Sequence, residues 1–178
     1  MPLSINGSGS LSTTGTSFVT YPGAVLQVQA ARSGPTKYVI TSATPTLITD
    51  LSIMFTPKKI GSLLIFNALI TSTLTHVTSF GIFKDGTATV STTGFTNTNQ
   101  PDMQITSYLA ETSNDTREDT LHQTSLMHYE TVTSLATATY GVYGTAGWDG
   151  TARSLHINNR SDSAMASFSY FTIMEVAQ

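Results

Sequence analysis

Short runs in which apolar and polar residues alternate follow one another along most of this chain. The clearest is the last, residues 166–178 (ASFSYFTIMEVAQ), where large apolar side chains alternate with small or polar ones. A period of two residues is typical of a half-buried β-strand. Because a strand in this position needs neighbours that are already in place, we expect it to close a β-sandwich.

The other extended runs are separated by breaks rich in Gly, Pro, Asn and Asp, and no segment has the period of an amphipathic helix. Asp85 and Gly86 between two runs predict a type I′ hairpin turn. We predict loops at residues 93–102 and 144–151. The predicted strands are residues 25–29, 37–41, 46–55, 62–70, 77–84, 87–92, 103–110, 121–132, 137–143, 154–158 and 166–178. This spacing favours an all-β fold, an antiparallel jelly-roll-like β-sandwich with an extended N-terminal arm.

Residues 1–23 differ from the rest because Gly, Ser and Thr dominate and large apolar residues are isolated. Such a segment cannot bury enough apolar surface to fold alone. We therefore divide the chain into an arm, residues 1–23, and a β-sandwich domain, residues 24–178. We expect the arm to lie against another chain, and docking on its own domain is the alternative.

Composition excludes several classes of function. Charged residues make up 11% of the chain, against about 25% in ordinary proteins, and the net charge is −3 without a basic run, so nucleic-acid binding is not expected. The absence of cysteine excludes disulfides and thiolate zinc sites. No apolar stretch is long enough to span a membrane, and the N-terminus lacks a signal core. We therefore expect synthesis and assembly in a cytoplasm, without membrane insertion.

Titratable residues do not form a recognisable catalytic motif. The acidic stretch at residues 111–119 could ligate Ca²⁺, but its spacing is not that of an EF-hand and a solvated loop is the alternative. His122, His128 and Glu130 share one face of a strand, yet the two histidines are about 20 Å apart at 3.3 Å per residue. They cannot share a metal within one chain, although a threefold axis could bring copies of one histidine together. We expect no catalytic residue, no cofactor, no metal and no enzymatic activity.

Trp148 is the only tryptophan, and it lies between glycines and beside Asp149. An exposed aromatic ring next to a carboxylate can hold a sugar ring, so Trp148, Asp149, Tyr143 and Tyr140 are candidates for contact with a glycan. The alternative is that Trp148 plugs the end of the sandwich or packs in a subunit interface.

Six segments, taken in order, resemble a family of small β-rich virion proteins of tailed bacteriophages, and the similarity spans about residues 24–177. The segments are residues 25–29 (VLQVQ), 53–65 (IMFTP to SLLI), 83–86 (FKDG), 140–142 (YGV), 153–160 (RSLHINNR) and 171–177 (FTIMEVA). In the arm, residues 5–9 (INGSG) are similar to segments near fibre-like parts of phage proteins.

The resemblance implies a jelly-roll-like homotrimer on the virion surface, assembled in the host bacterial cytoplasm. An arm followed by one globular domain, without a long shaft, suits a capsid decoration (cement) protein that binds the major capsid protein. The alternative is a short tail-fibre or receptor-binding tip that binds a tail component and a host surface glycan; a free lectin-like module is a third. Candidate particle-anchoring residues in the arm are Ile5, Asn6, Leu11, Phe18 and Tyr21.

The closing strand carries large residues on both faces. Phe171 and Ile173 lie on one face by parity, and Tyr170 and Met174 lie on the other. We therefore expect one face to enter the core and the other to meet a neighbouring subunit or a covering loop. Phe171→Ala should unfold the domain or dissociate the oligomer, whereas Ser169→Ala should do neither.

Overall fold

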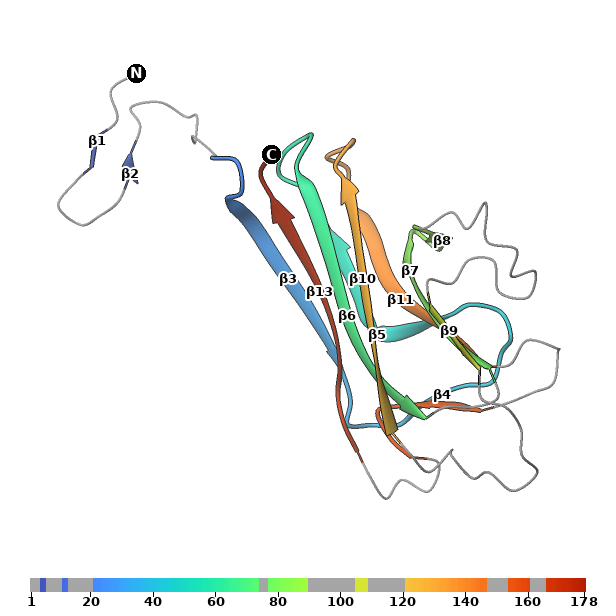
Figure 1. Ribbon diagram of the computed structural model, residues 1–178. Helices are drawn as coiled ribbons and strands as arrows, with labels where there is room; N and C mark the ends of the chain where they lie inside the picture. The colour runs from blue at the N-terminus through green and yellow to red at the C-terminus, as the bar shows by residue number, and fades with distance from the viewer. Residues whose placement is uncertain are drawn as a thin grey trace.

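The chain folds into antiparallel β-sheets that are curled into a half-barrel, an architecture compatible with the predicted β-sandwich (Figure 1). The computed structural model describes residues 4–5, 11–12, 21–73, 77–89, 105–108, 121–146, 154–160 and 166–178. All the regular secondary structure in these ranges is β-strand, as the alternating pattern predicted. None of the described segments forms a helix long and apolar enough to cross a membrane.

The first sheet of the sandwich is built around β6. On one side β6 pairs with β13, which pairs in turn with β3, and on the other side β6 pairs with β10. A short pair, β12 and β4, continues the sheet beyond the start of β13. The strands are β3 (Val25–Ser33), β4 (Tyr38–Ile40), β6 (Leu63–Thr73), β10 (Leu121–Thr131), β12 (Leu155–Ile157) and β13 (Ser169–Val176).

The second sheet has the order β5-β11-β7, and β7 also pairs with β8 and β9. Its strands are β5 (Thr46–Phe55), β7 (Val77–Lys84), β8 (Thr87–Ala88), β9 (Ile105–Tyr108) and β11 (Ala138–Ala146). In the predicted arm, β1 (Ser4–Ile5) pairs with β2 (Leu11–Ser12). The domain boundary near residue 23 stays a prediction.

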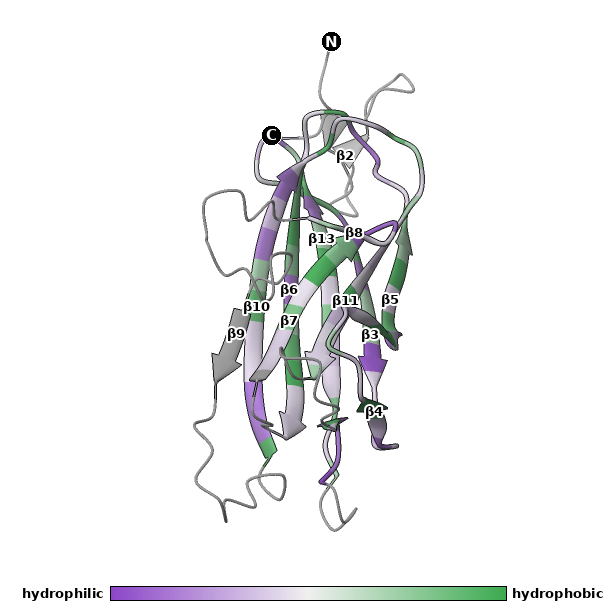
Figure 2. Ribbon diagram, turned by 90° about the vertical axis from the view of Figure 1, so that its right-hand side faces the viewer, coloured by the Kyte–Doolittle hydropathy of each residue, from purple (hydrophilic) through white to green (hydrophobic). Residues whose placement is uncertain are grey.

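Successive strands cross between the sheets, since β5, β7 and β11 belong to the second sheet while β6, β10 and β13 belong to the first. Such crossings are expected of a jelly roll. The jelly-roll assignment itself stays a prediction. One hydrophobic core joins the two sheets, and within it the rings of Phe66 on β6 and Tyr140 on β11 lie 4.9 Å apart. Figure 2 shows apolar and polar segments succeeding one another along β6 and β10.

The hairpin between β7 and β8 confirms the predicted tight turn. Asp85 and Gly86 both have positive φ, 49° and 78°, as a type I′ turn requires. The turn is fastened to β11, because the Asp85 amide donates to the Thr139 carbonyl over 2.8 Å and the Thr139 amide donates to Asp85 Oδ1 over 2.8 Å.

The predicted loop at residues 144–151 was wrong over its first residues, because β11 continues to Ala146 in register with β7. Gly144, at the start of the predicted loop, and Gly141, within the predicted strand, both lie in β11 and pack closely against neighbouring side chains. A Cβ on Gly144 would come within 3.0 Å of Ile40 Cδ1, and one on Gly141 within 2.5 Å of Leu47 Cδ1. A side chain at either position would require these neighbouring methyl groups to shift, and glycine within a strand often marks such a close approach.

The two faces of β13 divide as parity predicted. Phe171 and Ile173 are fully buried, whereas Tyr170 is 45% exposed. The prediction that Ser169→Ala neither unfolds the domain nor dissociates the oligomer stays a prediction, although the structure gives Ser169 a larger role than was expected of it. Ser169 is fully buried, donates to Asn158 Oδ1 over 2.6 Å and accepts a hydrogen bond from the Thr71 amide over 2.9 Å.

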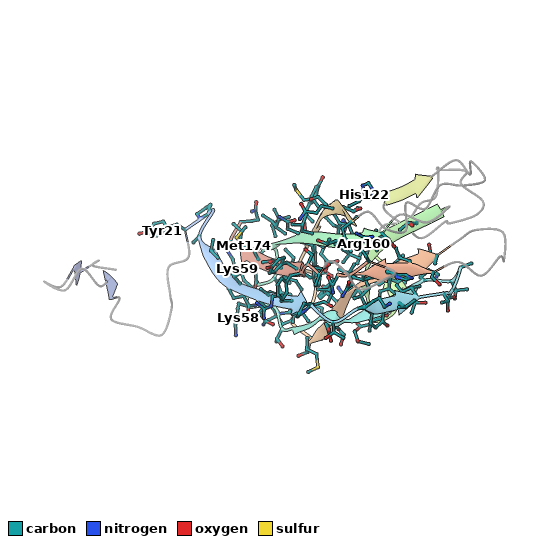
Figure 3. All side chains as sticks on the ribbon, turned by 90° about the horizontal axis from the view of Figure 1, so that it is seen from below. Tyr21, Lys58, Lys59, His122, Arg160 and Met174 are labelled. Carbon is teal, nitrogen blue, oxygen red and sulfur yellow. The ribbon has the colours of Figure 1, made fainter. Side chains whose placement is uncertain are left out.

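β3 begins and β13 ends at the same end of the sandwich, which we call the arm end (Figure 1). The opposite end, which we call the far end, contains the end of β6, the start of β10 and the end of β11. There Leu121 pairs with Thr73, and Ala146 pairs with Thr78 on β7. Figure 3 shows this polarity: Tyr21, Lys58 and Lys59 lie toward one end, and His122 and Arg160 lie toward the other.

Candidate functional site

The arm end is where residues 1–20 join the domain, and backbone pairing fixes the junction. The Gly23 amide donates to the Ala177 carbonyl over 2.7 Å, and the Ala177 amide donates to the Ala24 carbonyl over 2.8 Å. Immediately before this junction, the Ala24 amide donates to the Tyr21 carbonyl over 2.9 Å in a turn. The chain therefore enters the sandwich beside the last strand, at a defined point.

A buried carboxylate, Glu175 on β13, organises the neighbouring connection between β5 and β6. The successive amides of Lys58 and Lys59 donate to Glu175 over 2.9–3.0 Å. Ser62 Oγ donates over 2.6 Å and Gln27 Nε2 over 2.7 Å. Consecutive backbone N–H groups that converge in this way form a nest for an anion. The carboxylate thus joins β3, β13 and the β5–β6 connection.

Two opposing influences set the pKa of Glu175. Burial is the largest single influence and favours the neutral acid, but the hydrogen bonds from Ser62, Gln27, Lys58 and Lys59 together outweigh it, so the pKa lies below the ordinary value of 4.5. With its oxygens occupied by donors, the carboxylate is a structural anion and is not available as a general base. Its signal in the sequence was the parity of β13, which places an acidic residue on the core face.

A second carboxylate, Glu130 on β10, faces the interior at the same end. The Tyr140 hydroxyl donates a short hydrogen bond to Glu130 Oε1, and Lys84 Nζ forms an ion pair with the same oxygen over 3.1 Å. Lys84 also lies 5.4 Å from the centre of the Tyr140 ring. Burial, followed by the hydrogen bond to Glu130, raises the pKa of Tyr140 far above its ordinary value, so this phenol stays protonated.

These side chains line a small pocket of about 110 Å³ between Pro57, the β7–β8 hairpin and residues 132–138. The volume is well below the range of roughly 300–1,000 Å³ found for ligand pockets. Because the Glu130 carboxylate is already paired with an ammonium group and a phenol, the pocket presents a neutralised cluster. The small volume and the paired carboxylate favour a role in packing the surrounding connections over the binding of a small molecule.

The two histidines of β10 lie on one face of the strand, as parity predicted, and that face is turned toward the interior. His128 pairs with Phe66 in register and stacks on its ring at 5.5 Å. Burial lowers the pKa of His128, although the Glu130 carboxylate opposes this effect. His122 pairs with Ser72, and neither His122 Nε2 nor Ser72 Oγ has a hydrogen-bond partner among the described residues. The histidines therefore occupy separate parts of the interior.

The far end contains a network of buried hydroxyl and amide groups centred on Asn158. Asn158 Nδ2 donates to Ser33 Oγ over 2.9 Å, while its Oδ1 accepts from Ser169 Oγ. Its backbone amide donates to the Thr71 carbonyl over 2.8 Å. Asn158 has a φ of 65°, a conformation that Asn tolerates better than most residues. Serine and threonine thus serve as core residues here.

The structure describes three of the five candidate anchoring residues. Ile5 and Leu11 are partners in the β1–β2 pair. Tyr21 is 55% exposed at the arm end, where its side chain is accessible to a partner. Asn6 and Phe18 lie outside the described residues, and the anchoring role of all five stays a prediction.

Of the candidate glycan contacts, the structure describes Tyr140 and Tyr143. Tyr140 was wrong as a candidate, because its ring is buried in the core. Tyr143 is half-buried on the outer face of the second sheet, where its ring stacks on Phe83 with centroids 4.3 Å apart. One face of the ring is therefore already used for packing. Trp148 and Asp149 lie outside the described residues, so the structure does not show whether they join Tyr143.

The acidic stretch at residues 111–119 also lies outside the described residues. Within the described part of the chain, no group of three or more His, Asp or Glu side chains is placed to hold a metal ion. No protein-family model matches this chain, and no curated protein matches it.

Proposed function

We propose that this chain is a non-enzymatic structural protein on the surface of a tailed-phage virion, a capsid decoration protein docked through its N-terminal arm. The observation that carries the proposal is the polarity of the domain. Residues before Tyr21 enter at the end where β13 finishes, and the junction is fixed by two hydrogen bonds, from the Gly23 amide to the Ala177 carbonyl and from the Ala177 amide to the Ala24 carbonyl. An anchor attached there leaves the far end directed away from the particle.

The order of the family-like segments supports the proposal. Residues 25–29 lie on β3, residues 83–86 enclose the β7–β8 turn, residues 140–142 lie on β11 and residues 171–176 lie on β13. Residues 53–55 end β5 and residues 63–65 begin β6, on either side of the connection that Glu175 holds. These segments are strands or turns in the structure, which supports the resemblance to a β-rich virion domain.

In this proposal the fold is a jelly roll, three copies associate, and the partner of the arm is the major capsid protein. Assembly takes place in the host bacterial cytoplasm. The low charge of the chain fits a protein that is held in place by shape and neutral contacts rather than by ion pairs.

The second candidate is a short tail-fibre or receptor-binding tip. It is favoured by Tyr143, whose ring is partly exposed on the outer face of the second sheet and stiffened by stacking on Phe83. A rigid aromatic surface of this kind suits contact with a bacterial surface glycan.

The test is the number of copies on purified particles, measured by quantitative mass spectrometry against the major capsid protein. A number comparable with that of the capsid protein supports decoration. A number comparable with the few fibres of a tail supports the second candidate. Absence from purified particles contradicts both.

A further inference from the structure

The outer face of the first sheet is unusually apolar for a surface turned to water. Registers across β3, β13, β6 and β10 place Val28, Met174, Ile65 and Tyr129 in one continuous row. Tyr129 is 70% exposed and Val28 is 55% exposed. An antiparallel sheet that faces solvent on one side normally carries polar residues there.

The adjacent rows extend this face, which we call the outer face. The three further rows, each read from β3 to β10, are Ala30, Thr172, Asn67 and Met127; Arg32, Tyr170, Leu69 and Ser125; and Val25, Val176, Leu63 and Thr131. Arg32 is the single charged residue in the four rows, and its guanidinium lies 4.8 Å from the centre of the Phe168 ring. Met127 is 75% exposed.

Among the described strands, β10, at one side of this face, has no neighbour on its outer edge. It pairs with β6 alone among the described strands. It has eleven residues, and its outward side chains, Gln123, Ser125, Met127, Tyr129 and Thr131, are all uncharged. Natural sheets usually protect such an edge with charge, proline or a bulge, because unpaired amides and carbonyls are a template for another strand.

We propose that the outer face binds a second copy of this chain. With almost no charge, the face offers little to attract a phosphate, a nucleic acid or an acidic peptide, and it meets its own copy without like-charge repulsion. Four strands about 4.8 Å apart and seven residues long give roughly 450 Å² per copy. Two copies then cover about 900 Å², close to the 1,000 Å² or so at which specific interfaces begin.

The inference rests on the proposed function only for the expectation that copies of the chain associate. It deepens that function by naming the surface through which they associate. Exposure of 75% and 70% means that Met127 and Tyr129 contribute little to packing within one copy. A negative charge there should therefore leave the fold intact while burying an unpaired charge in the interface.

The experiment is light scattering of the full chain at micromolar concentration, for the wild type, Met127→Glu and Met127→Glu with Tyr129→Glu. The matched control is Met54→Glu, because Met54 is 71% exposed on β5 of the other sheet. We expect the wild type and Met54→Glu to have the mass of two or more copies. Met127→Glu should weaken association at least tenfold, and the double variant should be monomeric with an unchanged circular dichroism spectrum.

Three results would overturn the inference: a monomeric wild type, association of the double variant at wild-type strength, or equal loss of association in Met54→Glu. Deletion of residues 2–20 serves as a further arm of the test. If that deletion abolishes association while the double variant retains it, the arm joins the copies and the outer face does not. None of these outcomes depends on whether the protein is found on virions.

Discussion

Around Phe66 and Tyr140, toward the arm end, the core consists mainly of aromatic and aliphatic side chains, whereas around Asn158, toward the far end, hydrogen-bonded hydroxyl and amide groups lie among aliphatic side chains such as Ile157. Apolar packing provides stability roughly in proportion to buried area and is not directional. Hydrogen-bonded groups provide less net stability but fix geometry, because an unmade bond in the interior is costly. We infer that the arm end holds the domain together and that the far end holds its strands in register.

The largest expected effect comes from removing an aromatic ring from the apolar part of the core. Phe171 is fully buried and its ring lies 6.4 Å from that of Phe66. Phe171→Ala should lower the free energy of unfolding by about 3–5 kcal/mol, measured by urea denaturation. Tyr170→Ala is the control, since Tyr170 is the adjacent residue on the exposed face. Equal effects of the two substitutions would mean that the faces of β13 are wrongly assigned.

The Glu175 nest should give a smaller effect that depends on pH. Glu175→Gln places an amide NH₂ among four donors and should cost about 1–3 kcal/mol at neutral pH. Because the folded-state pKa of Glu175 is lowered below 4.5, its contribution is complete above that pH and is lost as the pH falls through the folded-state pKa.

The difference in stability between wild type and Glu175→Gln should therefore shrink on acidification below pH 4.5, as thermal melts at a series of pH values would show. A difference that stays constant down to the acid unfolding of the wild type would contradict the assigned pKa. Asp50→Asn is a suitable control, because exposed Asp50 accepts a single long hydrogen bond, 3.2 Å from Ser33 Oγ.

The smallest of the three effects is expected at the far end. Ser169→Ala removes the donor to Asn158 and the acceptor of the Thr71 amide, and it should cost about 1–2 kcal/mol. Ser125→Ala on the outer face of β10 should change stability by less than about 0.5 kcal/mol. Hydrogen exchange of the Thr71 amide should accelerate in Ser169→Ala relative to Ser125→Ala. Unchanged exchange would show that the network does not order this end.

The alternating pattern predicted much of the fold. The bounds of β5 and β7 follow from the alternation of apolar and polar residues, and the turn follows from Asp85 and Gly86. Both signals are local in the sequence. The continuation of β11 to Ala146 does not follow from a local signal, because Gly144 packs against Ile40 on another strand. The sequence pattern offers no local sign of such a contact.

The side-chain contacts at the arm end were harder to predict than the bounds of the strands. Parity placed Glu175 on one face of its strand with Phe171 and Ile173, and Glu130 on one face with the histidines. It did not show their partners, which come from distant segments: the amides of Lys58 and Lys59 for Glu175, and Lys84 and Tyr140 for Glu130. The hydroxyl network around Asn158 was missed for a similar reason. In a chain with 53 Ser and Thr residues, the type of residue does not distinguish a surface hydroxyl from a buried one.

The central claim is that the arm end attaches the domain to a particle. The most direct measurement is co-sedimentation of purified virions with the full chain and with a variant that lacks residues 2–20. Because the junction at Gly23 and Ala24 is retained, we expect the truncated protein to stay folded, with an unchanged circular dichroism spectrum, and to be absent from the sedimented particles. Co-sedimentation of the truncated protein at normal occupancy would contradict the claim.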